Sequence, residues 1–513
     1  MNGKSRIYIV GIDHLPKIYL AENIKNKGAL VGGTYLIHSS LQISGYWLLS
    51  SLVDNCNLVC SDDYARPFSS RIYSEKSKNE QEKEINKSIS KDKLREIKKI
   101  IFDSMTAREW EDSSGFGNLL DNVNTYLYQA IQIINNSKPH ILVFLDIPHD
   151  PWEIALAEYA KLRNVKIVCS VHTGLKDVYY VSLYPDISQP MFAEMIKRSP
   201  YVENKVNEYL RYDNAKVNYS TYNFDLNNKS FVNIVIIIPL ILVYKNIRFY
   251  FKTNFNNYHG FWRKINSEFR KNQVRPYIIR LIAKICRSIL HYCQLTHYQY
   301  KGFKNYRKNL STKKKKIIAL LQTRPEATQF PLSPYPDMYL AINSKARRLQ
   351  TCTGYELYFR EHPNMFAPGK WFCSKDISND EYNNKVFPMG ISLTDIFNQG
   401  DVCLVNTSTA GIEQSRRGIS VVSICSTWWL GLPNTNNIYD FFNKINDKSN
   451  RKSFDEVYRE KSKSFIHLPW FHVDAKKKNE LEAVNNLSNE QLKAIAYYAQ
   501  LLEYIFDKKS PSH

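Results

Sequence analysis

The chain has 513 residues, which is too long for a single ordinary hydrophobic core and predicts more than one domain. Hydrophobic residues make up 43% of the chain and aromatic residues 13%, a composition that excludes a wholly disordered protein. The formal net charge is +21, and the nine cysteines show neither CxxC pairs nor His-rich spacing, which favours a reducing compartment over a disulfide framework or a zinc site.

The N-terminal part of the chain begins with an apolar run. Residues 6–12 (RIYIVGI) predict a buried strand, and the run 43–53 has helix-like spacing. Residues 74–99 are charged and poor in apolar side chains, so we expect a solvated helix or a mobile excursion there, without a functional role. The first residues lack the apolar region and cleavage site of a signal peptide, so we expect a cytoplasmic protein.

A strand, a helix and a second strand follow one another at 140–150, 151–164 and 165–174. This order predicts a parallel sheet and a Rossmann-like domain. Both strands end in a histidine, His149 and His172, at the sheet edge where ligands collect in such folds. For His149 a structural role and a contact with a ligand are equally open, and for His172 the structural role is favoured.

The positive charge is concentrated in the middle of the chain. From Lys245 to Lys316 there are nineteen Lys or Arg residues and one acidic residue, so this segment carries +18 and the rest of the chain +3. The preceding apolar run, 231–244, is shorter than the ~18–20 apolar residues of a membrane-spanning helix. Two interpretations stay open: helices that lie on an anionic membrane surface, or connector helices with a solvated basic face.

A second α/β pattern begins at residue 315. We expect strands at 315–323, 355–360, 401–406 and 419–425. Helices are predicted at 338–350, 391–399 and 411–418, and an amphipathic helix at 487–507 follows the capping-type residue Ser488.

The stretch 404–418 (LVNTSTAGIEQSRRG) places hydroxyl side chains between a strand and a helix. The first turn of a helix has unpaired backbone N–H groups and a partial positive charge. Ser408 and Thr409 are placed to hold a phosphate there, with the N–H groups near Thr409 to Gly411, and Gly411 would allow a close approach of the backbone. An ordinary helix cap explains the same residues and is the favoured interpretation of this stretch taken alone.

Two other segments follow predicted strands of the same domain. His362 lies just beyond the strand 355–360 and precedes Pro363, and an imidazole there can donate to a phosphate oxygen or protonate a leaving group. Glu326 follows the strand 315–323 and is a candidate base, although loop glutamates are usually only solvated. Because all three segments lie beyond carboxyl ends of strands, we expect them to converge on one crevice.

In this arrangement the chain resembles the bacterial capsule and surface-carbohydrate glycosyltransferases that use CMP-activated acid sugars, including the Kdo transferases of capsule synthesis. The segments 146–167 and 415–433 are similar to segments of that family. The individual matches are His362-Pro363, Ser408-Thr409 and, in LLQTRPEATQFPL, Gln322, Pro325, Glu326 and Thr328.

The resemblance implies the GT-B architecture, an α/β fold in which two Rossmann-like domains face each other across a cleft, here with a basic helical connector. The expected order is an N-terminal acceptor domain, the connector with its membrane-surface segment, a nucleotide-sugar donor domain and a C-terminal helix. Their predicted ranges are 1–228, 229–312, 313–485 and 486–513.

In such enzymes the His-Pro and Ser-Thr pairs hold the nucleotide phosphate, and donors fixed there stabilise the transition state as CMP departs. We assign catalysis to Glu326, as base or nucleophile, and to His362. Arg324 and Arg360 are candidates for the sugar carboxylate, with a plain surface charge as the alternative. Donor binding is assigned to Gln322, Arg324, Arg360, Pro363, Thr407, Ser408, Thr409, Gly411 and Glu413, and acceptor binding to Asp146 and His149.

The expected donor is a CMP-sugar, with no cofactor and no metal required. The expected partners are a lipid-linked or surface glycan, in capsule or O-antigen synthesis, and the anionic inner face of the cytoplasmic membrane, but not nucleic acid. Three alternatives stay open. The first is a GT-B-type CDP-polyol phosphotransferase or UDP-sugar 2-epimerase, and the segment TAGIEQ resembles the UDP-GlcNAc 2-epimerases. The others are a basic nucleic-acid-binding protein, although no RNA-binding motif is visible, and a noncatalytic export or scaffold protein.

Overall fold

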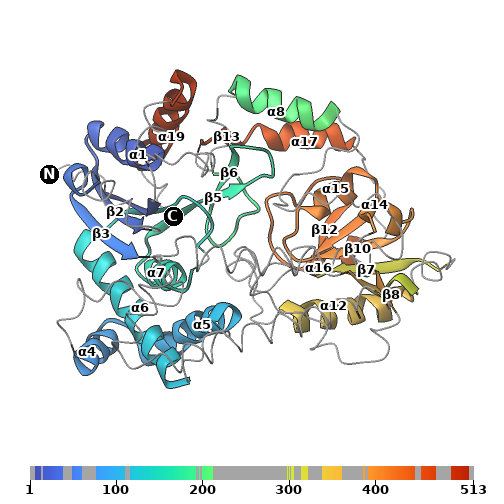
Figure 1. Ribbon diagram of the computed structural model, residues 1–513, viewed down its shortest axis with the longest axis horizontal. Helices are drawn as coiled ribbons and strands as arrows, with labels where there is room; N and C mark the ends of the chain where they lie inside the picture. The colour runs from blue at the N-terminus through green and yellow to red at the C-terminus, as the bar shows by residue number, and fades with distance from the viewer. Residues whose placement is uncertain are drawn as a thin grey trace, which may run out of the picture.

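The protein folds into two α/β units, one formed mainly by the N-terminal half and one by the C-terminal half (Figure 1). In this computed structural model the described residues are 6–12, 15–37, 49–60, 77–109, 116–148, 150–191, 196, 199–211, 297, 300, 302–304, 314–321, 338–360, 385–387, 391–444, 452–469 and 487–507.

The first unit contains a seven-stranded sheet in the order β13-β6-β5-β4-β1-β2-β3. Strands β1 to β5 pair in parallel, whereas β6 is antiparallel to β5 and β13 is antiparallel to β6. The parallel pairing of β4 with β5 confirms the predicted strand-helix-strand unit. The strand bounds are β1 Arg6–Ile12, β2 Leu30–Ile37, β3 Asn55–Cys60, β4 Ile141–Phe144, β5 Lys166–His172, β6 Val178–Leu183 and β13 Phe465–His467.

The second unit contains a six-stranded, fully parallel sheet in the order β12-β11-β10-β7-β8-β9. In both sheets the chain first adds strands on one side of its starting strand and then crosses to the other side, which is the Rossmann order. Two Rossmann-like sheets are therefore confirmed, while the cleft and the connector stay predictions. The bounds are β7 Lys316–Leu320, β8 Glu356–Arg360, β9 Val386–Phe387, β10 Val402–Val405, β11 Ser420–Ser423 and β12 Thr435–Asn437.

Helices cover both faces of the first sheet because its strands are apolar on both sides. In β1, Ile7 and Ile9 pack toward α1 and α19, whereas Tyr8 and Val10 pack toward the face covered by α4 to α7. The helix bounds are α1 Leu15–Asn26, α4 Lys78–Ser88, α5 Lys91–Glu109, α6 Phe116–Ser137, α7 Pro151–Leu162, α8 Pro200–Arg211 and α19 Asn489–Asp507.

Within the charged segment 74–99, the described residues from Ser77 onward form α4 and the first half of α5. Its few apolar side chains, among them Ile85, Leu94 and Ile97, are buried in the core. Of the two alternatives, the solvated helix is confirmed, since most residues of the segment are exposed, and about one apolar residue per helical turn holds it on the core.

The second sheet is also covered on both faces. Helix α12 packs against Ile317, Ala319 and Leu404 on one face, and α15 packs against Cys403 and Val405 on the other. The bounds are α12 Met338–Thr353, α14 Leu393–Ile396, α15 Ala410–Arg416, α16 Ile438–Lys444 and α17 Phe454–Ser462.

The C-terminal part of the chain returns to the first unit. Strand β13 pairs with β6, with Phe465 opposite Tyr180, and α19 packs against α1 (Figure 1). The predicted range 313–485 therefore includes one strand of the first sheet, β13. A strand of three residues is too short to show a sequence pattern from which this pairing could be predicted. The predicted boundaries at 228, 312 and 485 lie outside the described residues.

An aromatic junction joins the two units. The Trp428 ring centroid lies 6.0 Å from that of Tyr180, 5.2 Å from Phe465 and 6.4 Å from Tyr458. The Nζ of Lys461 donates to the Trp428 carbonyl at 3.0 Å, and burial lowers the pKa of this lysine to about 8. The units thus share a continuous apolar core at this point.

Arg416 makes a second link, between α15 and α8. Its guanidinium donates to the carbonyls of Tyr209 at 3.0 Å and Leu210 at 2.8 Å. These carbonyls belong to the last turn of α8, where a cation is favourable because the helix ends in unpaired acceptors. In Figure 1, α8 lies beside α17, which belongs to the same junction.

Among the described helices, none has the length and apolar character that crossing a bilayer requires. Of the predicted membrane-surface segment, 231–310, the structure describes only residues 297, 300 and 302–304, so peripheral attachment stays a prediction.

Asp401→Ala is expected to destabilise the second sheet. Asp401 lies 3.5 Å from the fully buried Nζ of Lys316 and accepts the backbone N–H groups of Lys316 and Asn398 at 2.9 and 2.8 Å. Loss of the carboxylate leaves a buried ammonium unpaired, which costs about 3–5 kcal/mol. Urea unfolding followed by tryptophan fluorescence measures this. The exposed Asp440→Ala control should lose less than about 1 kcal/mol, and equal losses in both variants contradict the prediction.

The burial of His467 makes the free energy of unfolding depend on pH. Its ring stacks on Tyr201 at a centroid distance of 3.9 Å, and burial lowers its pKa from 6.5 to about 4. Between these values the unfolded chain binds a proton that the folded chain does not. This contribution is therefore complete above pH 6.5 and declines as the pH falls toward 4, by up to about 1.4 kcal/mol per pH unit.

The measurement is the melting temperature of wild type and His467→Phe between pH 4 and 7. Phenylalanine keeps an aromatic ring beside Tyr201 and removes the titrating group. The variant should therefore show a flatter pH profile in this window, and identical profiles for both proteins would refute the assignment.

Candidate functional site

Three neighbouring strands of the second sheet lead into the segments that the sequence singles out. Strand β7 lies between β10 and β8, and all three are parallel. Leu404 of β10 is opposite Ala319, and Leu320 is opposite Arg360 of β8. The segments that begin at 322, 361 and 406 therefore all leave from the same carboxyl edge of the sheet.

The strand order also reverses at this edge. From β7 the chain adds β8 and β9 on one side, then crosses to β10 on the other. In open α/β sheets, ligands bind in the crevice beyond such a crossover point. The hydroxyl stretch after β10 and the segment after β7 begin on the two sides of that point.

Several predicted site residues lie outside the described part of the chain. The structure therefore does not place their side chains, and their assignments stay predictions. They are Gln322, Arg324, Glu326, His362 and Pro363 in the second unit and His149 in the first.

The loop between β10 and α15 already has internal partners for its backbone. The N–H of Ala410 donates to Ser408 Oγ at 3.3 Å, and the N–H of Gly411 donates to the Ser408 carbonyl at 3.0 Å. These amides, expected to face a phosphate, are engaged within the turn. The capping interpretation thus applies to Ser408, whereas Thr409 has a helical backbone and makes no capping bond through its hydroxyl.

Gly411 has a packing reason to be glycine. A Cβ at this position would lie 2.8 Å from Cη2 of Trp429 and 2.9 Å from its Cζ2. Trp429 is almost fully buried, at 1% exposure, so the tryptophan has no room to move away. This contact gives the glycine a packing role, and it does not test the close approach of the backbone to a phosphate that the sequence suggested.

Arg360 is buried, with an exposed fraction of 5%, and its Nη2 donates to the Ile391 carbonyl at 2.8 Å. This bond ties the end of β8 to the segment before α14. Arg360 is therefore not a plain surface charge, whereas its predicted role toward a sugar carboxylate is not tested by this contact.

Thr407 and Glu413 are half-buried on either side of the turn. Burial and then the Glu413 carboxylate raise the pKa of Tyr209, which places Glu413 near α8 of the first unit. Glu413 therefore belongs to the α15 surface that faces the junction. Sequence reasoning missed this role, and also that of Arg416, because the partner backbone lies about two hundred residues away.

The first sheet has its own crossover point, between β1 and β4. Asp146 follows β4 there, is half-buried, and accepts the N–H of Ile147 at 2.7 Å. Its position at the carboxyl edge agrees with the predicted acceptor role without testing it. His172 has the structural role that was favoured, since its Nδ1 accepts the N–H of Gly174 at 3.1 Å and its ring packs edge-on against Tyr179.

Among the described residues, no cluster of His, Cys, Asp or Glu has the arrangement to hold a metal ion. The predicted independence from metal is not tested by this.

No family model matches the chain, and no curated protein matches it either. Two solved structures show a distant likeness, and both are KpsC proteins of Thermosulfurimonas dismutans. The first, "beta Kdo 2,4 transferase", has a TM-score of 0.31 and 8% identity over 66% of this chain and 88% of its own. The second, "beta Kdo 2,7 transferase", has a TM-score of 0.27 and 11% identity over 71% of this chain and 88% of its own. At TM-scores below 0.5 the likeness carries no argument about fold or function.

Gly411→Ala is expected to lower the free energy of unfolding by about 1–3 kcal/mol, because the new methyl group overpacks against Trp429. A double-mutant cycle with Trp429→Phe isolates this contact, since phenylalanine removes the ring atoms nearest to Gly411. Chemical denaturation of the four proteins should show a smaller cost of Gly411→Ala in the Trp429→Phe background. The same cost in both backgrounds would remove the packing explanation.

Proposed function

We propose that this protein is a GT-B-type glycosyltransferase that moves an acidic sugar, Kdo or a nonulosonic acid, from a CMP-sugar to a growing surface glycan. The observation that supports it most is the parallel adjacency of β10, β7 and β8. That adjacency starts the three motif segments from one sheet edge, at a crossover point where such sheets bind ligands.

The proposed reaction requires hydrogen-bond donors around the phosphate of the leaving CMP. As the anomeric C–O bond breaks, negative charge grows on the departing CMP, and groups fixed beside it stabilise the transition state. In this proposal the hydroxyls of Ser408 and Thr409 and the imidazole of His362 supply those groups. The amides of Ala410 and Gly411 are left out, because they donate within the turn.

The remaining roles rest on the sequence. Arg324 supplies a cation for the sugar carboxylate, and Gln322, Pro363 and Thr407 complete the donor site. Glu326 either accepts the proton of the acceptor hydroxyl or first attacks the anomeric carbon. Asp146 and His149, from the other unit, bind the acceptor.

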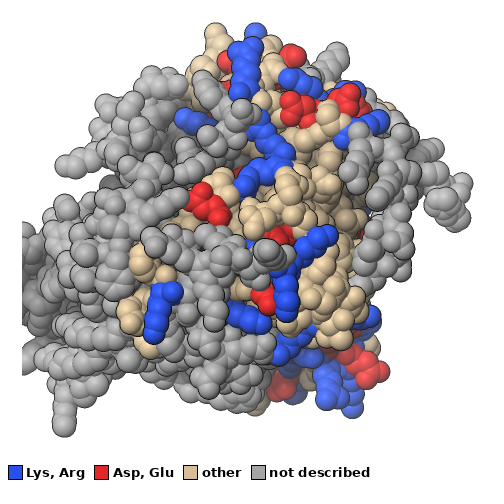
Figure 2. Space-filling model, turned by 90° about the vertical axis from the view of Figure 1, so that its right-hand side faces the viewer, with Lys and Arg blue, Asp and Glu red and all other residues tan. Residues whose placement is uncertain are grey.

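Membrane attachment is part of the proposal. On the face that Figure 2 turns to the viewer, described Lys and Arg side chains lie among Asp and Glu. Of the net charge of +21, the segment Lys245 to Lys316 carries +18, so the excess positive charge is assigned to this segment, which overlaps the predicted membrane-surface segment 231–310. Each Lys or Arg near an anionic surface contributes on the order of 1 kcal/mol. The acceptor would be a lipid-linked glycan at the inner membrane face.

CMP binding tests the site. CMP should raise the melting temperature of the wild-type protein more than UMP does. Ser408→Ala and His362→Ala should each weaken CMP binding by about tenfold, the loss of a charge-assisted hydrogen bond, while far-UV circular dichroism stays unchanged. Ser344→Ala, on the exposed side of α12, and His297→Ala are the matched controls. Unchanged CMP affinity in both site variants removes the site.

Turnover tests the reaction. The protein is incubated with CMP-Kdo or a CMP-nonulosonate and a surface-glycan fragment, and mass spectrometry follows the transfer. Sugar addition supports the proposal. CMP or CDP binding with polyol-phosphate transfer, or turnover of a UDP-sugar, would replace it with the alternative GT-B chemistries, and RNA binding without any nucleotide response would replace it with a nucleic-acid-binding function.

A further inference from the structure

A pocket of about 580 Å³ opens at the amino edge of the first sheet. Arg6 begins β1, His140 precedes β4 and Val165 precedes β5, so the pocket lies at the edge opposite to the one from which Asp146 leaves. It is therefore separate from the proposed transfer site.

Four cationic side chains line this pocket, Arg6, Lys87, Lys138 and Arg163, and none of its described lining residues is acidic. His140 adds no charge at neutral pH, because burial and then the nearby Arg6 lower its pKa. The pocket is therefore positively charged, at a place where no function has been assigned.

Helix ends explain only part of this charge. The C-terminal ends of α4, α6 and α7 contribute lining residues, and each helix end carries about −0.5 charge. Three such ends balance about −1.5 of the four positive charges. About +2.5 therefore remains at the pocket, carried in part by Lys87, Lys138 and Arg163, which are exposed to solvent.

The four cations have no described partner that would neutralise them. None of their side chains makes an ion pair or hydrogen bond with a described residue, and the Nε of Arg6 is buried without a hydrogen-bond partner among these residues. A buried donor left unpaired costs about 1–3 kcal/mol, which an anion bound to the guanidinium would recover.

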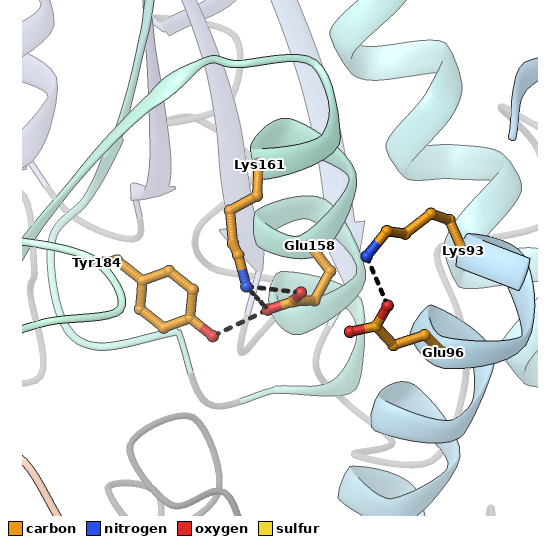
Figure 3. Close-up of polar contacts among 5 residues, drawn as sticks. All are labelled: Lys93, Glu96, Glu158, Lys161 and Tyr184. Atoms are coloured by element: carbon orange, nitrogen blue, oxygen red, sulfur yellow. Dashed lines mark hydrogen bonds and ion pairs between the residues drawn. The ribbon is translucent and has the colours of Figure 1, made fainter.

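A lysine just before the pocket shows the contrast (Figure 3). The Nζ of Lys161 lies 2.9 and 3.0 Å from the two oxygens of Glu158, which also accepts from Tyr184 at 3.3 Å. On the facing helix, Lys93 pairs with Glu96 at 2.8 Å. Lys161 and Lys93 thus have carboxylate partners, whereas the four cations that line the pocket have none among the described residues.

The volume and walls of the pocket indicate the ligand. Small-molecule sites span roughly 300–1,000 Å³, which is larger than a single inorganic phosphate needs. Ile134, Val165 and the ring of Tyr159 add apolar and aromatic walls. Arg6 and Arg163 supply planar guanidinium groups, which bind phosphate through two parallel hydrogen bonds.

We propose that this pocket binds a small organic phosphate with at least two negative charges, such as a phosphorylated sugar, independently of the donor site.

Isothermal titration calorimetry of the full chain tests this, with fructose 1,6-bisphosphate as the probe and citrate as a carboxylate ligand for comparison. The titrations are made in 150 mM NaCl with saturating CMP, which occupies the proposed donor site. The wild type should bind the bisphosphate saturably and more tightly than citrate. Arg163→Ala and Lys87→Ala should each weaken this binding by about tenfold, the loss of one charge-assisted contact. Lys99→Ala, an exposed position on α5, removes the same charge outside the pocket and should bind like wild type.

Ser408→Ala should leave bisphosphate binding unchanged, so failure of the donor site and failure of this pocket are separate results. Circular dichroism of each variant establishes that it is folded. The proposal is overturned by absence of saturable binding to wild type, by tighter binding of citrate, or by equal affinities of the wild type, Arg163→Ala and Lys87→Ala.

Discussion

The central position of β7 in the second sheet is the constraint on which the candidate site depends. Its neighbours β10 and β8 run parallel to it, in fixed register, so three loops distant in sequence must begin along one edge. The start of β7 is fixed by the buried Lys316–Asp401 pair, in which the carboxylate also holds the backbone of both segments. A slip of one residue would turn every β7 side chain to the opposite face and misalign these loops.

The second unit is tied to the first by α15 and by the loop after β11. The amino end of α15 adjoins the hydroxyl turn, and Arg416 near its other end binds the last carbonyls of α8. Trp429 packs on Gly411 in the same helix, and Trp428 packs in the aromatic junction. One short helix thus connects the candidate donor site with the first unit. Its glycine leaves room for Trp429, and its arginine caps the end of α8.

The cationic side chains of the molecule differ in whether they have a carboxylate partner. In α7, Lys161 is neutralised by a buried glutamate, and in the second sheet the buried Lys316 has Asp401. The cations at the amino edge of the first sheet have no described carboxylate partners, although three helix ends lie beside them. That difference, more than the total charge of the chain, points to an anion site there.

The sequence alone determined the class of fold and the location of its main elements. Strand β1, the unit from β4 to β5, and the strands β7, β8, β10 and β11 follow from apolar runs that end in polar residues, because buried parallel strands require such runs. The stretch after β10 was also identified correctly as a turn between strand and helix. Short elements such as β12 and β13 leave no such pattern in three residues.

Tertiary structure alone decided what the individual residues do. Gly411 is explained by a tryptophan eighteen positions away, Arg360 by a carbonyl before α14, and Arg416 by the end of a helix in the other unit. The basic pocket joins residues from β1, three helix ends and two loops. Local sequence encodes burial and turns, but contacts between distant segments are fixed only when strand order and register bring those segments together.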